Sequence, residues 1–211
     1  MTKIIFVHGW GFDGSIWDNV ICELNDIETV CLDLGFFGQE QTSFNDKDAI
    51  FITHSMGLAW VLKNVKPSYK GLVSINGFTK FCQAEDWPEG VPQRMLSRMI
   101  RQFDKNPETV WSDFMIKSGL DNPVYPPYTN LATLSKGLKD LGEWDVREEF
   151  SALSCPKLIC CAKGDMIVSE KLSDDSFGKG VEWYESANHL LPLQQAPSIA
   201  AHIRSFVEKL T

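Results

Sequence analysis

The sequence predicts an α/β fold built on a parallel β-sheet. Short apolar runs recur along the chain, and most of them end in a turn marked by glycine, aspartate, asparagine or serine. Amphipathic helical segments separate several of these runs. Strands that alternate with helices are typical of parallel sheets with right-handed crossovers. A strand, a sharp turn with a serine at its apex and a helix follow one another at 49–65, and we expect the chemistry of the chain to be centred there.

Six segments have the length and apolar character of strands in a parallel sheet that is covered on both faces. Helices between them are indicated by apolar positions spaced three and four residues apart. The predicted strands are Lys3–Val7, Glu28–Leu32, Ala49–Thr53, Gly71–Ile75, Lys157–Ala162 and Val181–Glu185. The predicted helices are Ile16–Leu24, Leu58–Val65, Ser169–Asp175 and Gln195–Leu210.

The strand pattern stops between residues 79 and 151. Helical patterns replace it, and proline-containing loops punctuate them. Proline removes a backbone donor and ends helices, so these loops divide the segment into short helices. We therefore predict a core formed by residues 1–78 and 152–211, with an all-helical cap formed by residues 79–151 inserted in it.

Length and composition set the class of protein. A chain of 211 residues can form one domain, with or without an inserted subdomain, and can bury a sizeable core. Hydrophobic residues make up 44% and charged residues 23%, which is typical of a soluble globular protein. The net charge of −8 argues against nucleic acid or an anionic membrane as a general partner. The N-terminal apolar run Ile4–Val7 is too short for a signal peptide or a membrane span, and we expect a cytoplasmic monomer.

The six cysteines do not form a C-x-x-C pair. Cys31, Cys160 and Cys161 lie within strand-like apolar runs, where a thiol behaves as a small hydrophobic side chain. We expect reduced cysteines, as in a cytoplasmic protein, and we expect neither a metal site nor a cofactor.

The stretch Ala49–Gly57, A-I-F-I-T-H-S-M-G, predicts a nucleophile elbow. In that motif a serine is held at a sharp turn between a strand and a helix, with its oxygen exposed at the end of the sheet. The usual pattern is G-x-S-x-G. Here Thr53 stands where the first glycine belongs and only Gly57 matches, so the pentapeptide around Ser55 is a weak signal by itself.

Two further strand ends carry the partners that a serine nucleophile needs. Asp165 follows the predicted strand Lys157–Ala162, and His189 follows the predicted strand Val181–Glu185. Carboxyl ends of parallel strands meet at one edge of the sheet, so both side chains are expected near Ser55. Serine, aspartate and histidine in this order are typical of a catalytic triad on this architecture.

The other three histidines are weaker candidates. We expect His8 to be structural and to brace the loop beside Gly9. His54 precedes the serine and is expected to point back along the strand or out to solvent. His202 lies within the last predicted helix and is expected at the surface.

Two backbone N–H groups are candidates for stabilising an oxyanion. Met56 follows the predicted nucleophile, and Trp10 lies in the H-G-W-G turn after the first strand. Gly9 and Gly11 allow that turn to bend towards the serine without obstruction by a side chain. An H-G-W turn directly after an apolar strand, about 45 residues before a candidate elbow, is a strong combination.

With these residues in place, the chain resembles an α/β-hydrolase from Ile4 to about Phe206. The resemblance implies a minimal six-stranded parallel sheet that lacks the usual N-terminal hairpin, with the cap inserted after Gly77. Within that superfamily the chain is most similar to the pimeloyl-acyl-carrier-protein methyl ester esterases of biotin synthesis. The similar stretches are H-G-W-G-F-D-G-S-I-W, D-L-G-F-F-G, F-C-Q-A-E-D-W-P-E-G and D-V-R-E-E-F-S-A-L-S-C-P with G-D-M-I-V.

A basic stripe is predicted on one helix of the cap. In Val91–Lys105, the residues Arg94, Arg98, Arg101 and Lys105 recur at spacings of four, three and four, which places them on one helix face. Met95, Leu96, Met99, Ile100 and Phe103 form the apolar side. This stripe on an acidic protein would suit an acidic partner such as an acyl carrier protein, and the alternative is an ordinary solvated face.

The leading interpretation is a serine carboxylesterase that acts on an acyl methyl ester, with Ser55 as nucleophile, His189 as base and Asp165 as its orienting acid. Two alternatives remain open at this point. A small-ester hydrolase or a thioesterase could use the same triad, because fold alone does not choose among them. A non-catalytic binding protein that retains the pocket is the alternative from another class, and Thr53 is the reason to consider it.

Overall fold

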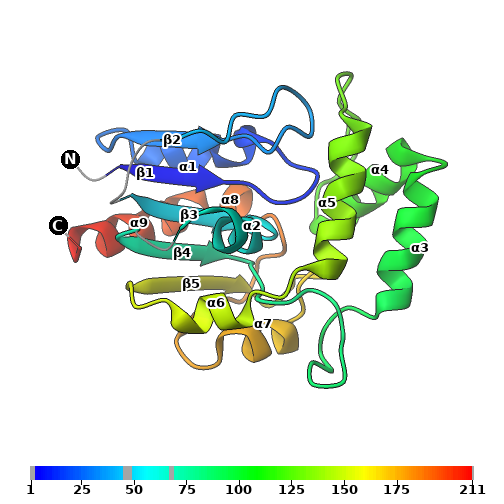
Figure 1. The fold of residues 1–211 in the computed structure, drawn as a ribbon. Helices are drawn as coiled ribbons and strands as arrows, with labels where there is room; N and C mark the ends of the chain where they lie inside the picture. The colour runs from blue at the N-terminus through cyan, green and yellow to red at the C-terminus, as the bar shows by residue number, and fades with distance from the viewer. Residues whose placement is uncertain (1–2, 45–48, 67–68, 211) are drawn as a thin grey trace.

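The computed structural model describes residues 3–44, 49–66 and 69–210 (Figure 1). Residues 1, 2 and 211, at the outer ends of the two predicted core segments, lie outside the described residues. Within the described residues, no helix is both long enough and apolar enough to cross a membrane.

The sheet is parallel throughout and follows the order β2-β1-β3-β4-β5-β6. Its β3 lies next to β1 and β4, so the serine of the predicted elbow is placed near the middle of the sheet edge. All of β1, β3 and β4 are buried, as expected for strands covered on both faces. The strands are β1 (Ile4–Val7), β2 (Thr29–Leu32), β3 (Ile50–His54), β4 (Gly71–Ile75), β5 (Lys157–Ala162) and β6 (Val181–Tyr184).

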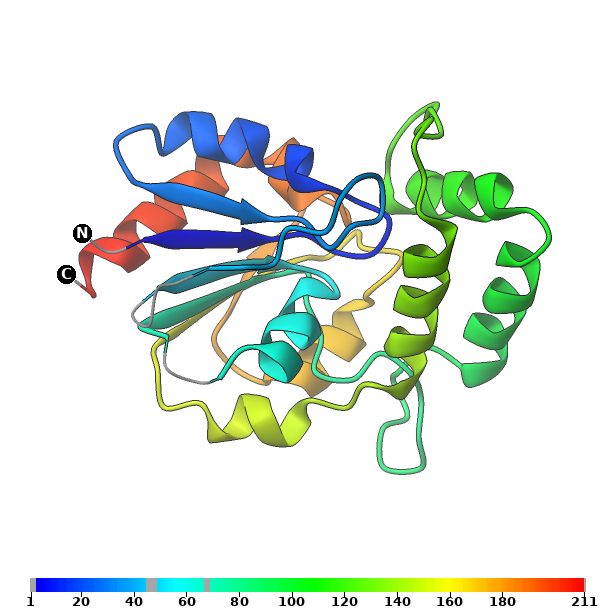
Figure 2. The ribbon, with the colours of Figure 1, turned by 45° about the horizontal axis from the view of Figure 1, so that its top comes forward.

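Helices cover the two faces of the sheet (Figure 2). Alternate strand residues point to opposite faces, so Ile5 and Phe51 pack in one apolar cluster while Ile4 and Ile50 pack in the other. The face of Ile5 is covered by α2 (Gly57–Asn64), α6 (Arg147–Ala152) and α7 (Glu170–Phe177). The face of Ile4 is covered by the short 3-10 helix η1 (Gly14–Trp17), α1 (Asp18–Glu23), α8 (Leu191–Gln194) and α9 (Ala196–Glu208).

Three helices form a separate layer beyond the carboxyl ends of the strands, where the arrowheads point in Figure 1. They are α3 (Gln93–Phe103), α4 (Pro107–Ser118) and α5 (Leu131–Glu143), all within the segment predicted as the cap. The helix nearest to the sheet is α5, and α3 lies on its outer side. The apolar cluster that contains Leu58 of α2 also contains Leu134 and Leu138 of α5, so this layer packs on the core.

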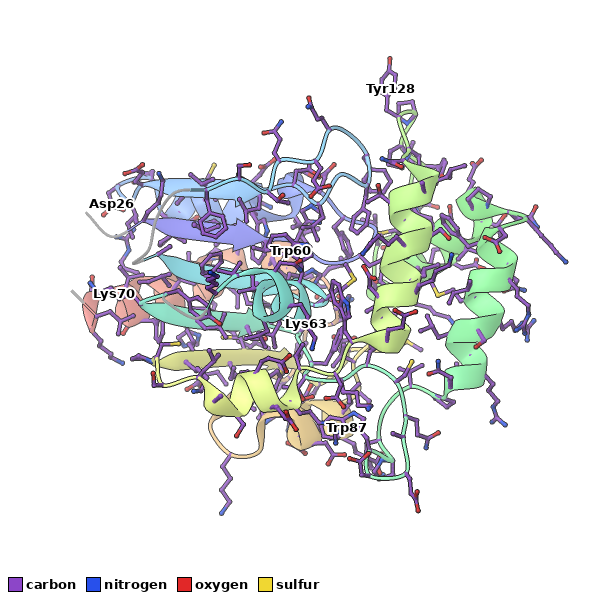
Figure 3. All side chains as sticks on the ribbon, viewed as in Figure 1. Asp26, Trp60, Lys63, Lys70, Trp87 and Tyr128 are labelled. Carbon is purple, nitrogen blue, oxygen red and sulfur yellow. The ribbon has the colours of Figure 1, made fainter. Side chains whose placement is uncertain are left out.

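The two chain segments that connect this layer to the core lie side by side. Val146 N–H donates to the carbonyl of Thr79, and Lys80 forms an ion pair with Asp145 at 2.8 Å. Arg147 joins Asp145 to Asp86. Its guanidinium also lies 5.0 Å from the ring centroid of Trp87, which Figure 3 labels. The Arg147 guanidinium holds the pKa of the Asp145 carboxyl well below its usual range.

The predicted fold class is confirmed, and the observed elements begin and end within two or three residues of the predicted bounds. The division into core and cap at residues 79 and 151 stays a prediction. His202, expected at the surface, has a partner on the sheet. It is partly buried on α9, where its Nδ1 lies 2.7 Å from the hydroxyl of Tyr184 on β6.

Candidate active site

Ser55 lies at a sharp turn between β3 and α2. Its φ is +53°, in the left-handed region that few residues other than glycine adopt without strain. Its N–H donates to the carbonyl of Ile75 on β4, and its own carbonyl accepts from Leu58 N–H in the first turn of α2. The turn is therefore fixed by backbone hydrogen bonds on both sides, as a nucleophile elbow requires.

Two glycines allow the elbow to pack against β1. A Cβ at Gly57 would lie 2.6 Å from the carbonyl oxygen of Val7 and 2.9 Å from that of His8, so no larger residue fits there without movement of the backbone. A Cβ at Gly9 would lie 2.8 Å from the Cβ of Ser55. The H-G-W-G turn after β1 is thus in direct contact with the elbow.

Thr53 occupies the position of the missing glycine as an ordinary strand residue. It is fully buried in β3, where it pairs with Val7 of β1 and Ser74 of β4. Its hydroxyl donates a 3.0 Å hydrogen bond to the carbonyl of Val73. The side chain is therefore accommodated with its polar group paired, while Ser55 keeps the positive φ of the elbow.

The structure brings Ser55, His189 and Asp165 together in one hydrogen-bonded chain. His189 Nε2 lies 3.0 Å from Ser55 Oγ, and His189 Nδ1 lies 2.7 Å from Asp165 Oδ2. The other carboxylate oxygen of Asp165 accepts from the N–H groups of Ile167 and Val168. Since the carboxylate accepts from Nδ1–H, Nε2 is free to accept the hydroxyl proton of Ser55.

The three side chains of the Ser55–His189–Asp165 chain are buried. His189 is fully buried, and Ser55 and Asp165 are also buried. Phe114 of α4 covers the histidine, with the two ring centroids 6.2 Å apart. Charge that forms in such a site is poorly screened by water, so each polar contact there has more effect than at the surface.

Met56 directly follows Ser55 in the elbow, and Trp10 follows Gly9, which packs against the Cβ of Ser55. Within the part of the chain that the structure describes, neither backbone N–H donates a hydrogen bond to another residue. Two N–H groups without partners beside a serine are what an oxyanion requires.

The turn that carries Trp10 is held by the helical layer as well as by β1. The Trp10 indole donates to the carbonyl of Leu134 on α5, and the indole of Trp111 on α4 donates to the carbonyl of Gly11, each at 2.8 Å. Gly11 has a φ of +74°, which glycine adopts without strain. Two cap helices therefore fix the position of the predicted oxyanion turn.

His54 differs from the expectation. It neither points back along the strand nor reaches solvent: it is fully buried under His189, and the two ring centroids are 4.8 Å apart. Burial and the neighbouring His189 hold the pKa of His54 well below its usual value. Because β3 is a central strand with helices on both faces, no direction from it leads to water.

His8 braces its loop, as expected. Its Nδ1–H donates to the carbonyl of Gly9, and its Nε2 accepts from Leu34 N–H at 3.0 Å. The side chain thereby joins the turn after β1 to the loop after β2 and takes no part in the Ser55 chain.

A groove of about 400 Å³ leads away from the elbow between the core and the helical layer. Its walls come from the loop after β2, from α2 and from α5, and Met56 lies on its floor. Trp60 of α2, labelled in Figure 3, forms part of one wall, and Lys136 and Asp140 of α5 form an ion pair on the other. The lining of the groove is about equally apolar and polar, with Leu34, Phe36 and Phe44 beside Glu40, Thr42 and Asn64.

The basic residues predicted on α3 are exposed. Within the described residues, Arg94, Arg98 and Arg101 form no ion pair with an acidic side chain. The predicted apolar side is correct for Leu96 and Phe103, which are buried, and for Met99 and Ile100, which are partly buried. It is wrong for Met95, which is 54% exposed.

Sheet order, elbow and strand-end residues together define an α/β-hydrolase fold. Solved structures with this arrangement support it. An esterase from Exiguobacterium antarcticum superposes with a TM-score of 0.82 at 14% identity and covers 99% of this chain and 92% of its own. MenH from S. aureus superposes with a TM-score of 0.74 at 15% identity and covers 99% and 94%.

Sequence comparison finds a similarity to a more specific class of enzymes. Two curated proteins named pimeloyl-acyl-carrier-protein methyl ester esterase are similar to this chain. The one from Wigglesworthia glossinidia brevipalpis is 28% identical over 81% of this chain and 78% of its own. The one from Vibrio atlanticus is 24% identical over 98% and 94%. No family model matches the chain. The resemblance predicted from the motifs is thus confirmed.

Proposed function

We propose that the chain is a serine carboxylesterase that hydrolyses an acyl methyl ester. The observation that carries this proposal is the hydrogen-bonded chain Ser55–His189–Asp165 at 3.0 and 2.7 Å, next to two backbone N–H groups that have no partner among the described residues. Similarity to curated methyl ester esterases supports the same reaction class.

The reaction follows from this geometry. Ser55 Oγ attacks the ester carbonyl as its proton passes to His189 Nε2, and the carbonyl oxygen takes up the negative charge facing the N–H groups of Trp10 and Met56. Asp165 stabilises the imidazolium that forms. His189 then gives the proton to the departing alkoxide, methanol leaves, and the acyl group remains on Ser55. Water attacks the acyl-enzyme by the same route and restores the serine.

The proposed substrate is a pimeloyl methyl ester on an acyl carrier protein, as in biotin synthesis. Support comes from the names of the relatives, from the groove beside Met56, and from the exposed Arg94, Arg98 and Arg101 on an otherwise acidic protein. A carrier protein with an acidic surface would be attracted to that face of α3.

Hydrolysis of pimeloyl-carrier methyl ester and of p-nitrophenyl acetate tests the reaction. Wild type is expected to turn over both esters, and Ser55→Ala is expected to lose at least about 10³-fold in kcat. Ser205→Ala, an exposed serine on α9, is the matched control and should keep full activity. Turnover of only the small ester would leave a small-ester hydrolase. An intact wild type that neither turns over an ester nor is labelled at Ser55 by an organophosphonate would leave a binding protein.

Reversing the charge of the three arginines on α3 tests whether this face of the helix binds the carrier protein. Replacing Arg94, Arg98 and Arg101 by Glu is expected to raise KM for the carrier ester about tenfold or more at low salt and to leave p-nitrophenyl acetate hydrolysis unchanged. The control replaces three exposed lysines far from α3 by Glu, namely Lys66, Lys179 and Lys209. An equal rise of KM in both triple variants would show that net charge, and not this face, attracts the carrier.

A further inference from the structure

The loop that carries His189 is held by three consecutive carbonyl groups. Gly164 N–H donates to the carbonyl of Ala187 at 3.0 Å. The side-chain amide of Asn76 donates to Asn188, and the imidazole of His54 donates to His189, each at 2.9 Å. The donors come from the carboxyl ends of β5, β4 and β3, so three neighbouring strands hold one loop.

The loop has further bonds close to His189 in the chain: Asn188 N–H donates to the side-chain oxygen of Gln194, and Leu190 N–H donates to that of Asn188, each at 2.9 Å. It runs from the end of β6 at Tyr184 to the start of α8 at Leu191, and Glu185 and Ser186 are exposed. A loop of this kind moves unless its backbone groups are bonded. Yet His189 must reach Ser55 and Asp165 at the same time, each within 3.0 Å. A displacement of one ångström would break at least one of the two contacts.

We propose that His54 and Asn76 are positioning residues that set the place of the His189 imidazole by holding the carbonyls of residues 188 and 189. The proposal rests on the function proposed above, in which His189 is the base.

The chemistry of His54 suits this role. A carbonyl only accepts, so Nε2 of His54 carries the proton, and Nδ1 is then bare. That Nδ1 is buried and has no partner among the described residues, and Phe12 and Trp17 pack edge-on against the ring. Burial keeps His54 neutral, with a pKa well below its usual value. The neutral ring therefore places no positive charge next to the titratable groups that face it, His189 and His8.

The chemistry of Asn76 links the acid to the base. Asn76 has a φ of +48°, a conformation that asparagine adopts more readily than most residues. Its Oδ1 accepts from Ala162 N–H at the end of β5, which leads to Asp165, and its Nδ2 donates to Asn188 in the histidine loop. One buried side chain thereby fixes the distance between the backbone segments that carry Asp165 and His189.

Kinetics of p-nitrophenyl acetate hydrolysis give the first test. His54→Phe fills the space of the ring and removes the donor, and kcat is expected to fall about 10- to 100-fold with little change in KM. His54→Gln retains a donor and should recover most of that loss. Trp17→Phe is the matched control, because Trp17 packs on the same ring and donates no hydrogen bond to the loop. It should retain wild-type kcat.

The tautomers of the histidines give a second measurement, which a simple loss of packing would not change. In protein labelled with ¹⁵N-histidine, wild type is expected to show His54 protonated at Nε2 and His189 protonated at Nδ1. In His54→Phe the His189 signals should change to a mixture of tautomers, because its contact with Asp165 is no longer enforced. This measurement does not depend on turnover. A wild type without esterase activity would defeat the proposed function and leave the comparison of tautomers intact.

Two results would overturn the proposal. One is a folded His54→Phe with wild-type kcat and an unchanged His189 tautomer. The other is an equal loss of kcat in His54→Phe and Trp17→Phe without a change of tautomer. If His54→Phe does not fold, Asn76→Asp carries the same test, because its carboxylate keeps an acceptor for Ala162 and places a negatively charged acceptor, which cannot hold a carbonyl, where the donor to Asn188 was. Wild-type kcat and tautomer in that variant would also overturn it.

Discussion

The Ser55 turn and the His189 loop meet at one hydrogen bond and are held in different ways. The Ser55 turn is built from backbone: a positive φ, two N–H···O=C bonds and Gly57 packed against the carbonyls of Val7 and His8. The His189 loop is held mainly from outside, by donors that approach it from three strand ends. The first arrangement cannot yield without disturbing the sheet, whereas the second can shift because part of the loop is exposed.

Of three substitutions that compare the two regions, Gly57→Ala should have the largest effect, and it tests whether the Ser55 turn is rigid. The added Cβ would meet the carbonyl oxygens of Val7, at the end of β1, and of His8, in the turn that follows it. We expect at least a 100-fold loss of kcat on p-nitrophenyl acetate and a destabilisation of about 1–3 kcal/mol, measured by denaturant unfolding. Near-normal activity would show that the elbow adjusts as easily as a loop.

Gly164→Ala adds the same methyl group next to the loop that carries His189. Its Cβ would lie 2.6 Å from the carbonyl oxygen of Ala187, which belongs to the partly exposed loop. Because that loop can move away, we expect a smaller loss of kcat, about 10-fold, and a destabilisation of about 1 kcal/mol. A loss as large as that of Gly57→Ala would mean that the His189 loop is as rigid as the elbow.

Thr53→Val should have the smallest effect on activity, and it tests whether the Ser55 turn depends on side chains as well as on backbone. The change keeps the shape of the side chain and removes only the hydroxyl that donates to Val73. The buried carbonyl of Val73 loses that donor, so we expect a destabilisation of about 1–2 kcal/mol by denaturant unfolding. Activity on p-nitrophenyl acetate should stay within about threefold of wild type. A large loss of activity would mean that the threonine, and not only the backbone, shapes the elbow.

The same contrast explains what the sequence could predict. The Ser55 turn is encoded within a few residues: an apolar strand, a serine, Gly57 and an amphipathic helix are contiguous, so a local pattern predicts it. Asp165 and His189 were predicted from their places after strands, because parallel strands deliver such residues to one edge. The structure brings both to Ser55, although their catalytic roles stay a proposal.

The residues that hold the histidine loop were not predictable in this way. Before the structure, His54 was only a neighbour of the serine, and Asn76 was only the start of an Asn-Gly turn. Their bonds reach Asn188 and His189, more than 100 residues further along the chain. A contact of that kind leaves no periodicity and no motif, so no local pattern reports it. Met95 was misplaced for a related reason, since the side of α3 that is covered depends on where α5 lies.

Two indole hydrogen bonds connect the turn after β1 to the helical layer. Trp10 in the turn donates to Leu134 of α5, and Trp111 of α4 donates to Gly11 in the turn. If α4 and α5 swing away from the core to admit a bulky substrate, both bonds to that turn are lost together. The conformation that is open is then one in which Trp10 N–H is no longer held in place. In the proposed esterase, the position of the predicted oxyanion turn therefore depends on contact with both α4 and α5.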